Sequence, residues 1–308
     1  FYDGRIEGKE GQSIQGAISE TEEDYNIVKY KNGENENYNI ENGYEISILE
    51  KLDVVHLKST DKGYSSLEKA IIESAETDTI TILSEISINT IQIDENKNIV
   101  IDLNGNNINI GNDEKIINNG NLEITNTKEE GKIIGNTANI LNNENATLNV
   151  KASLELKISG KCIENKGNLI IEEGANITTN AGSSYLIYNI GEGNVIQREG
   201  NITTKGRRTH GIYNAESGNI TIEGGSITTQ SNDSDGIYNY GAGNVNVTGG
   251  NITATYTGSS GIRNNSSGVI TIEGGEITGY TGIMNQGNGE VTIINGTITG
   301  RYYRNANS

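Results

Sequence analysis

The side chains best placed for acid–base chemistry are two arginines, a histidine and two aspartates from neighbouring repeats of the sequence. Arg207, Arg208 and His210 precede one copy of a repeated phrase. Asp233 and Asp235 precede the next copy, 25 residues later. Matching positions on stacked strands lie about 4.8 Å apart, so these groups could form an acid–base pair. On an open surface they would instead form a salt-bridge ladder that contributes about 0–1 kcal/mol.

We favour the salt-bridge interpretation because of the length of the repeats. An active cleft needs walls, and proteins build such walls from long loops. The last repeats keep to 21–25 residues without an insertion. The sequence therefore predicts no catalytic residue and a protein that is not an enzyme. It also lacks the spacing of zinc ligands and a glycine-rich phosphate loop, so we expect no metal and no cofactor.

A column of tyrosines is a candidate site for ligand binding. Tyr188, Tyr213 and Tyr238 recur at the repeat spacing and are expected to point outward, with Tyr185 and Tyr240 nearby. Such rings could form a flat strip on which sugar rings stack. Packing between neighbouring strands explains the same column, and we favour packing. These five tyrosines are the predicted ligand-binding residues.

The elements that position these side chains follow from an asparagine that recurs every 21–25 residues, and the last four copies stand in the phrase Gly-Ile-x-Asn. An inward asparagine at a corner can hydrogen-bond the asparagine above and below it through its amide. It also tolerates the left-handed backbone that a sharp corner needs. We predict a structural ladder made of Asn118, Asn142, Asn165, Asn189, Asn214, Asn239, Asn264 and Asn285.

One repeat, residues 211–235, contains three short runs of β-branched residues separated by turns. Within a run, Ile220 and Ile222 alternate with Thr221, which is the period of a strand. Gly224-Gly225 marks a corner. The repeat predicts an all-β protein, a right-handed parallel β-helix with three strands and about 25 residues per coil. The handedness follows from the general preference of parallel crossovers.

Two positions depart from this pattern. Gln197 aligns with the inward Ile222, so it is either a buried polar side chain that needs a partner or a sign that the register slips. Asp94 stands where the ladder would have its next asparagine. Cys162, the one cysteine, aligns with Gly211 and is expected to be a small buried residue rather than a reactive thiol.

Four regions are expected along the chain. Residues 1–19 resemble the closing coil of a preceding repeat, because Phe1–Gly8 and Ile293–Gly300 share one pattern. Residues 20–63 are expected to form a small β-hairpin or meander that acts as a linker. Residues 64–78 are expected to hold a capping helix and residues 79–308 the parallel β-helix. We infer that the chain is one unit of a tandem array.

The helix should cover the open end of the core, since terminal repeats of a solenoid need a cap. Leu67, Ala70, Ile71 and Ala75 share one face, and Ser65 with Glu68 has the spacing of a capping box.

The net charge of −18 and the pI of about 4.6 argue against nucleic acid as a partner. No stretch approaches the roughly 20 apolar residues of a membrane span, so membrane insertion is not expected.

The order of motifs is similar to a known family. Tyr64, Ser66, Leu67, Ala70 and Ile71, followed by Ile101-Asp-Leu-Asn-Gly105, look like pectin-lyase-like β-helix repeats in large surface proteins of Gram-positive bacteria. The resemblance implies an extracellular array on the bacterial cell surface, of the kind presumed adhesive. Its motifs specify architecture rather than chemistry.

The expected function is therefore a non-enzymatic extracellular repeat module that acts as a rigid stalk or adhesin. Its expected partners are neighbouring repeats of the same array, with host glycans or surface proteins as further candidates. One alternative is a glycan-binding module that uses the tyrosines, and another is a polysaccharide lyase or hydrolase.

Overall fold

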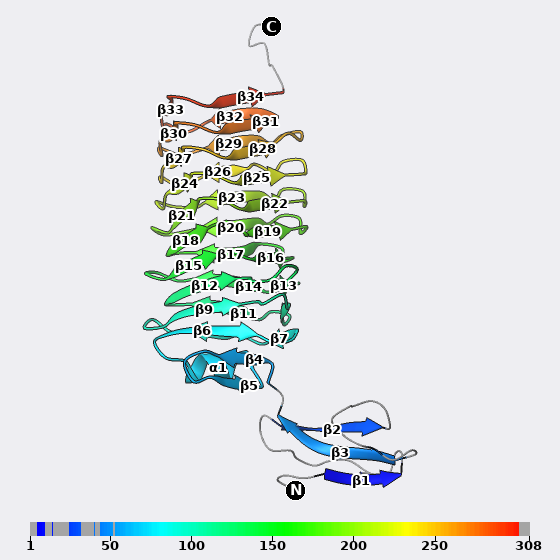
Figure 1. Ribbon diagram of the computed structural model, residues 1–308. Coiled ribbons are helices and arrows are strands. Elements are labelled where there is room, and N and C mark those ends of the chain that lie inside the picture. The colour runs from blue at the N-terminus through cyan, green and yellow to red at the C-terminus, as the bar shows by residue number, and fades with distance from the viewer. Residues whose placement is uncertain are drawn as a thin grey trace.

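The computed structural model describes residues 5–9, 14, 25–31, 40, 44–51 and 53–301. From residue 77 onward the chain winds into a stack of coils, and each full coil gives one strand to each of three sheets (Figure 1). All strand pairs between successive coils are parallel. The prediction of an all-β parallel β-helix with about 25 residues per turn is confirmed. The right-handed sense of the β-helix stays a prediction, because a left-handed and a right-handed β-helix have the same strand pairing.

The ladder sheet holds the asparagine column and has nine strands. They are β8 (Ile91–Ile93), β11 (Lys115–Asn118), β14 (Asn139–Asn142), β17 (Lys161–Asn165), β20 (Tyr185–Asn189), β23 (His210–Asn214), β26 (Ile237–Asn239), β29 (Ser260–Asn264) and β32 (Thr281–Asn285).

The threonine sheet has ten strands, and an outward threonine column runs along its second half. They are β7 (Ile86–Ile88), β10 (Ile108–Ile110), β13 (Lys132–Gly135), β16 (Ser153–Leu156), β19 (Asn176–Thr179), β22 (Asn201–Thr204), β25 (Ser226–Thr229), β28 (Asn251–Ala254), β31 (Glu276–Gly279) and β34 (Thr297–Gly300).

The cap sheet has twelve strands. Ten of them come from the coils: β6 (Thr77–Ile82), β9 (Asn98–Asp102), β12 (Asn121–Thr125), β15 (Thr147–Val150), β18 (Asn168–Ile171), β21 (Asn194–Gln197), β24 (Ile220–Ile222), β27 (Val245–Val247), β30 (Ile270–Ile272) and β33 (Val291–Ile293). The hairpin of β4 (Val55–Leu57) and β5 (Lys62–Tyr64), which we had placed in the linker, extends this sheet because β4 pairs antiparallel with β6.

Alternation along each strand decides which side chains form the core. In β24, Ile220 and Ile222 are buried while Thr221 lies partly exposed between them. Successive coils repeat this arrangement, so one continuous apolar core runs through the stack. The paired glycines at the corner after β24 have separate roles. Gly225 takes a φ of 71°, and a Cβ on Gly224 would lie 2.3 Å from the carbonyl oxygen of Arg198.

The register does not slip at Gln197, which pairs with Ile222. Gln197 is fully buried, and its Nε2 donates to the carbonyl oxygens of Gly200 and Ser226, both at 3.1 Å. The interpretation of Gln197 as a buried polar side chain is therefore confirmed, although its Oε1 has no partner.

The expectation for Asp94 was wrong. Asn118 pairs with Ile93, so Ile93 occupies the ladder position of the first coil and Asp94 is exposed. Ile93 belongs to the same apolar core as the buried face of the capping helix, where an amide would lack a partner. The amide oxygen of Asn118 accepts instead from the backbone N–H of Gly120, at 3.3 Å.

The cap consists of helix α1 (Leu67–Glu73) together with β4 and β5 at the N-terminal end of the stack (Figure 1). Leu67, Ala70 and Ile71 are buried in the core, whereas Ala75 lies beyond the helix and is exposed. The N-cap is Ser66 rather than Ser65, because the Ser66 side chain accepts from the backbone N–H of Lys69 at 3.2 Å.

Two side chains hold the cap to the first coil. The ammonium of Lys97 donates to the carbonyl oxygens of Ile71 and Ser74, so it supplies the positive charge that the end of α1 lacks. Asp78 accepts from the backbone N–H groups of Ser59, Thr79 and Ala75. Burial alone would raise the pKa of Asp78, but a hydrogen bond from the Ser59 side chain and these backbone hydrogen bonds lower it below its ordinary value.

A separate sheet precedes the cap, with β3 (Tyr44–Lys51) between β1 (Arg5–Lys9) and β2 (Tyr25–Lys31), all antiparallel. The strand within the predicted closing coil of residues 1–19 thus pairs antiparallel here. Part of that range, and residues 302–308 at the end of the predicted β-helix, lie outside the described residues.

Candidate functional site

The structure brings all eight predicted ladder asparagines together in one column. Each amide nitrogen, from Asn118 to Asn264, donates to the amide oxygen of the asparagine one coil further on, at 2.7–3.0 Å. All but Asn285, in the last coil, are fully buried.

The second N–H of these amides is also used. Asn214 and Asn239 donate to the carbonyl oxygens of Gly218 and Gly243, at 2.6 and 2.7 Å. None of the eight asparagines has a positive φ, so the expected left-handed backbone was wrong. The asparagine is required at this corner for its amide, which donates and accepts at once.

A second buried polar column, which the sequence analysis missed, lies where the chain enters the ladder sheet. The hydroxyls of Thr209, Ser234 and Ser259 accept the backbone N–H of Ser184, Thr209 and Ser234, respectively, at 2.9–3.4 Å. These four residues are buried. Their 25-residue spacing was a visible signal, but serine and threonine are common at exposed turns and strands.

The predicted arginine–histidine–aspartate cluster splits into two parts. Arg207 and Arg208 lie 3.3 and 4.0 Å from the Asp233 carboxylate. The side chains of both arginines are 66% exposed and that of Asp233 is 45% exposed, so this part is a solvated salt bridge.

Asp235 lies instead on the outer face of the ladder sheet, where it is fully buried beneath Arg263. Its Oδ1 accepts from the backbone N–H of Ser260 at 2.6 Å and from the Arg263 Nη2 at 3.2 Å. Its Oδ2 lies 3.0 Å from the Arg263 Nε, without hydrogen-bond geometry. The His210 Nδ1 is 3.3 Å from Oδ2, but it also accepts the backbone N–H of Asp235 at 3.1 Å.

This arrangement has the residue types of a hydrolytic triad without its geometry. The column runs His210, Asp235, Ser260, so the serine lies next to the aspartate rather than the histidine. The Ser260 hydroxyl is buried and has no partner. A nucleophile must reach both its base and its substrate, and this serine reaches neither.

The five predicted tyrosines form one aromatic cluster centred on Tyr213. The rings of Tyr188 and Tyr213 are nearly parallel, with centroids 5.5 Å apart and 5° between planes. Tyr185 lies 4.4 Å, Tyr238 5.1 Å and Tyr240 6.0 Å from Tyr213. Tyr188 and Tyr213 stack, whereas Tyr238 meets Tyr213 edge-on with 75° between the ring planes, so the five rings do not form one flat strip.

Two rings of the cluster each have a cation against their face. The Lys161 ammonium lies 4.1 Å from the ring centre of Tyr188, and the Arg263 guanidinium lies 5.4 Å from that of Tyr238. Burial, followed by the effect of Tyr185, raises the pKa of Tyr213 well above its ordinary value. Tyr240, at 56% exposure, is the most exposed ring of the cluster.

Cys162 is buried at the start of β17. Burial raises the pKa of its thiol to about 11, so the reactive thiolate is scarce at neutral pH. Among the described residues, no three metal-ligating side chains gather in one place, and no helix is long and apolar enough to cross a membrane.

Comparison of the chain with models of protein families, with curated proteins and with solved structures gives no match.

Proposed function

We propose that this chain is a non-enzymatic, extracellular repeat module of a bacterial cell-surface protein, in which it acts as a rigid stalk or adhesin. The single observation that supports this function best is the unbroken amide ladder. Seven consecutive bonds join Asn118 to Asn285 and run parallel to one continuous apolar core. Bending such a rod would break buried hydrogen bonds, which is costly in an apolar interior.

The shape of the coils supports a role without catalysis. The longest connection between successive strands of the coils is the short segment 230–236, and no inserted loop rises above the sheets between residues 77 and 300. The carboxylate best placed for acid–base chemistry, Asp235, is buried and paired with Arg263. We also propose a relationship with pectin-lyase-like repeats of Gram-positive surface proteins, on the motifs from Tyr64 to Ile71 and from Ile101 to Gly105.

Glycan binding at the tyrosine cluster is a second candidate, favoured by the exposed ring of Tyr240. The other four tyrosines are only partly exposed, so Tyr240 is the ring that a sugar reaches most easily. A Tyr240→Ala variant isolates that contribution, with Tyr256→Ala as a matched control, because Tyr256 is 48% exposed and lies outside the cluster.

One experiment tests the adhesive and the catalytic interpretations together. Beads coated with the chain are applied to host matrix proteins and to immobilised polysaccharides, while release of reducing sugars and of unsaturated products is followed in solution. Retention without product formation is expected. Turnover that disappears in Asp235→Asn or Arg208→Ala would establish an enzyme and overturn the proposal.

A further inference from the structure

The edge of the solenoid between the ladder sheet and the cap sheet contains two hollows, and unequal turn lengths create them. The turn 166–167 has two residues, whereas the turns 143–146 below it and 190–193 above it have four each. The turn 119–120 is equally short and lies between the longer turns 94–97 and 143–146. Each short turn therefore leaves a hollow between two projecting neighbours.

Glycine makes the short turns feasible. A Cβ on Gly167 would lie 2.2 Å from the carbonyl oxygen of Ala146, and one on Gly120 would lie 2.3 Å from that of Asp94. Because glycine has no side chain, the backbone of each short turn packs directly against the longer turn beneath it.

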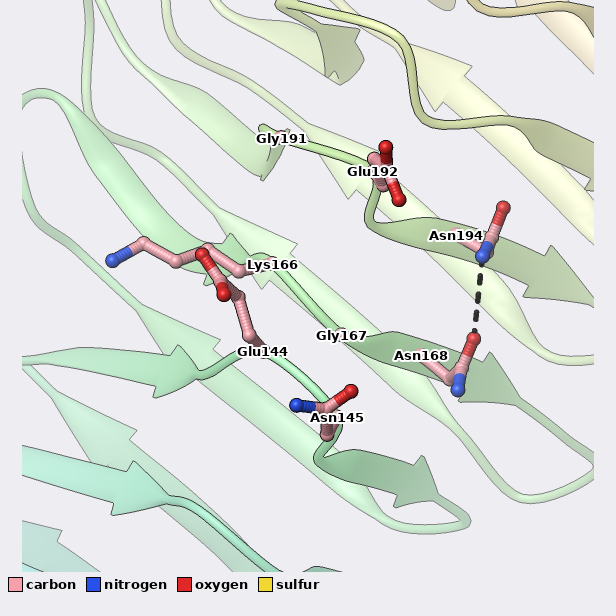
Figure 2. A pocket seen from close by; sticks show the side chains of 8 residues that line it. All are labelled: Glu144, Asn145, Lys166, Gly167, Asn168, Gly191, Glu192 and Asn194. Atoms are coloured by element: carbon pink, nitrogen blue, oxygen red, sulfur yellow. Dashed lines mark hydrogen bonds between the residues drawn. The ribbon is translucent and has the colours of Figure 1, made fainter.

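The upper hollow has a volume of about 350 Å³ and a wholly polar set of side chains. Figure 2 shows the Glu144 carboxylate beside the stem of Lys166, with Asn168 and Asn194 joined by a hydrogen bond on the other side. Glu192 stands on the projecting turn above. Within the described part of the chain, Glu144, Glu192 and Lys166 form no ion pair, so their charges are available to a ligand.

The lower hollow, of about 330 Å³, adjoins the upper one and shares Glu144, Asn145 and Lys166 with it. Glu95, Asn119 and Asn143 complete its lining. Its floor lies two coils below that of the upper hollow, which is about 10 Å at the spacing of paired strands. The two hollows form one polar groove along the edge, and each hollow alone is at the lower end of the size range of small-molecule sites.

We propose that this groove binds an uncharged oligosaccharide, so that it supplies the ligand contact of the adhesin function proposed above, on which this inference rests. Asparagine amides both donate to and accept from hydroxyl groups, and the glutamate carboxylates accept from them, which are the combinations that neighbouring sugar hydroxyls need. The lining offers no apolar side chain, so an apolar ligand or a peptide anchor has nothing to bury against.

The charges that line the groove restrict the class of oligosaccharide further. Two glutamates and one lysine line each hollow, and the whole chain carries a net charge of −18. These charges disfavour polymers rich in uronic acid or sulfate, while the Lys166 ammonium disfavours a metal cation. Because the groove spans two hollows, an oligosaccharide that fills both binds more tightly than a monosaccharide.

The test is a printed array of neutral hexose and N-acetylhexosamine glycans, with uronic-acid glycans on the same slide, followed by titration of the best neutral glycan. Glu144 lines both hollows, so Glu144→Gln is expected to weaken binding at least about tenfold. Glu192→Gln and Glu95→Gln each remove one carboxylate from a single hollow and are expected to weaken binding less. Glu273→Gln, an exposed glutamate outside both hollows, is the matched control and leaves binding unchanged.

Three results overturn the proposal: no neutral glycan binds, the uronic-acid glycans bind best, or Tyr240→Ala abolishes binding while Glu144→Gln does not. Unfolding curves for each variant distinguish a lost contact from a lost fold. If no glycan on the slide binds, the proposed stalk function is unaffected, because the rigidity of the rod is tested by a separate distance measurement.

Discussion

Two polar features of the ladder sheet satisfy their buried groups in opposite ways. Inside, the asparagine column joins eight coils through uncharged amides, each of which both donates and accepts. On the outer face, Asp235 is a single buried carboxylate that depends on Arg263 from the next coil. Each asparagine amide accepts from the asparagine of one neighbouring coil and donates to that of the other, so the same residue type repeats along the column. A carboxylate only accepts, so Asp235 cannot pass a hydrogen bond on to a matching residue in the next coil and is paired with Arg263 instead.

Loss of Arg263 is expected to have the largest effect on stability. Arg263→Ala leaves the Asp235 carboxylate buried without its cation, which costs about 3 kcal/mol. Denaturant unfolding followed by circular dichroism measures the change. Adding Asp235→Asn to Arg263→Ala is expected to recover part of the loss, because the buried charge is then gone. If Arg263→Ala unfolds like the unmodified chain, the ion pair does not stabilise this face.

The next largest effect is expected inside the ladder. Asn239→Ala removes the acceptor of one Asn214 N–H and the donor that reaches the Asn264 oxygen from the preceding coil, at a cost of about 1–3 kcal/mol. Asn232→Ala is the matched control, because Asn232 is exposed in the turn before the same strand. Equal melting temperatures for the two variants would show that the ladder contributes little.

The hydroxyl column is expected to matter less than the amide ladder. Ser234→Ala removes the acceptor of the Thr209 backbone N–H, and the expected cost is about 1 kcal/mol. The same denaturation experiment measures it. A loss larger than that of Asn239→Ala would reverse the order of importance of the two columns.

The smallest effect is expected at a partly exposed ion cluster, and it depends on pH. Hydrogen bonds from Lys132 and Lys157 lower the pKa of Glu155 from 4.5 to about 2. Its stabilisation is therefore complete above about pH 4.5 and is lost as the pH falls towards 2. Glu155→Gln should cost up to about 1 kcal/mol at pH 6, and the cost should shrink steadily as the pH falls towards 2. The effect of Asn239→Ala, by contrast, should not follow this titration.

The same contrast explains what could be predicted from the sequence. The strands, the asparagine column and the corner glycines recur, so their spacing alone revealed them. Arg263, the partner of Asp235, occurs once and replaces a tyrosine in its column, so no period pointed to it. The short turns at 119–120 and 166–167 change the spacing by only a few residues, and the hollows they create arise from the difference between neighbouring coils. The ring orientation in the tyrosine cluster depends on packing that spacing does not encode.

The most direct test of the central claim, that the coils form one rigid rod, is a distance measurement between its ends. Ser87 and Thr299 are exposed and lie nine coil steps apart in one column of the threonine sheet. Spin labels on cysteines at these positions, with Cys162→Ser, report their separation by pulsed electron paramagnetic resonance. The account predicts one narrow peak near about 43 Å. A broad distribution, or two populations that change with temperature, would contradict it.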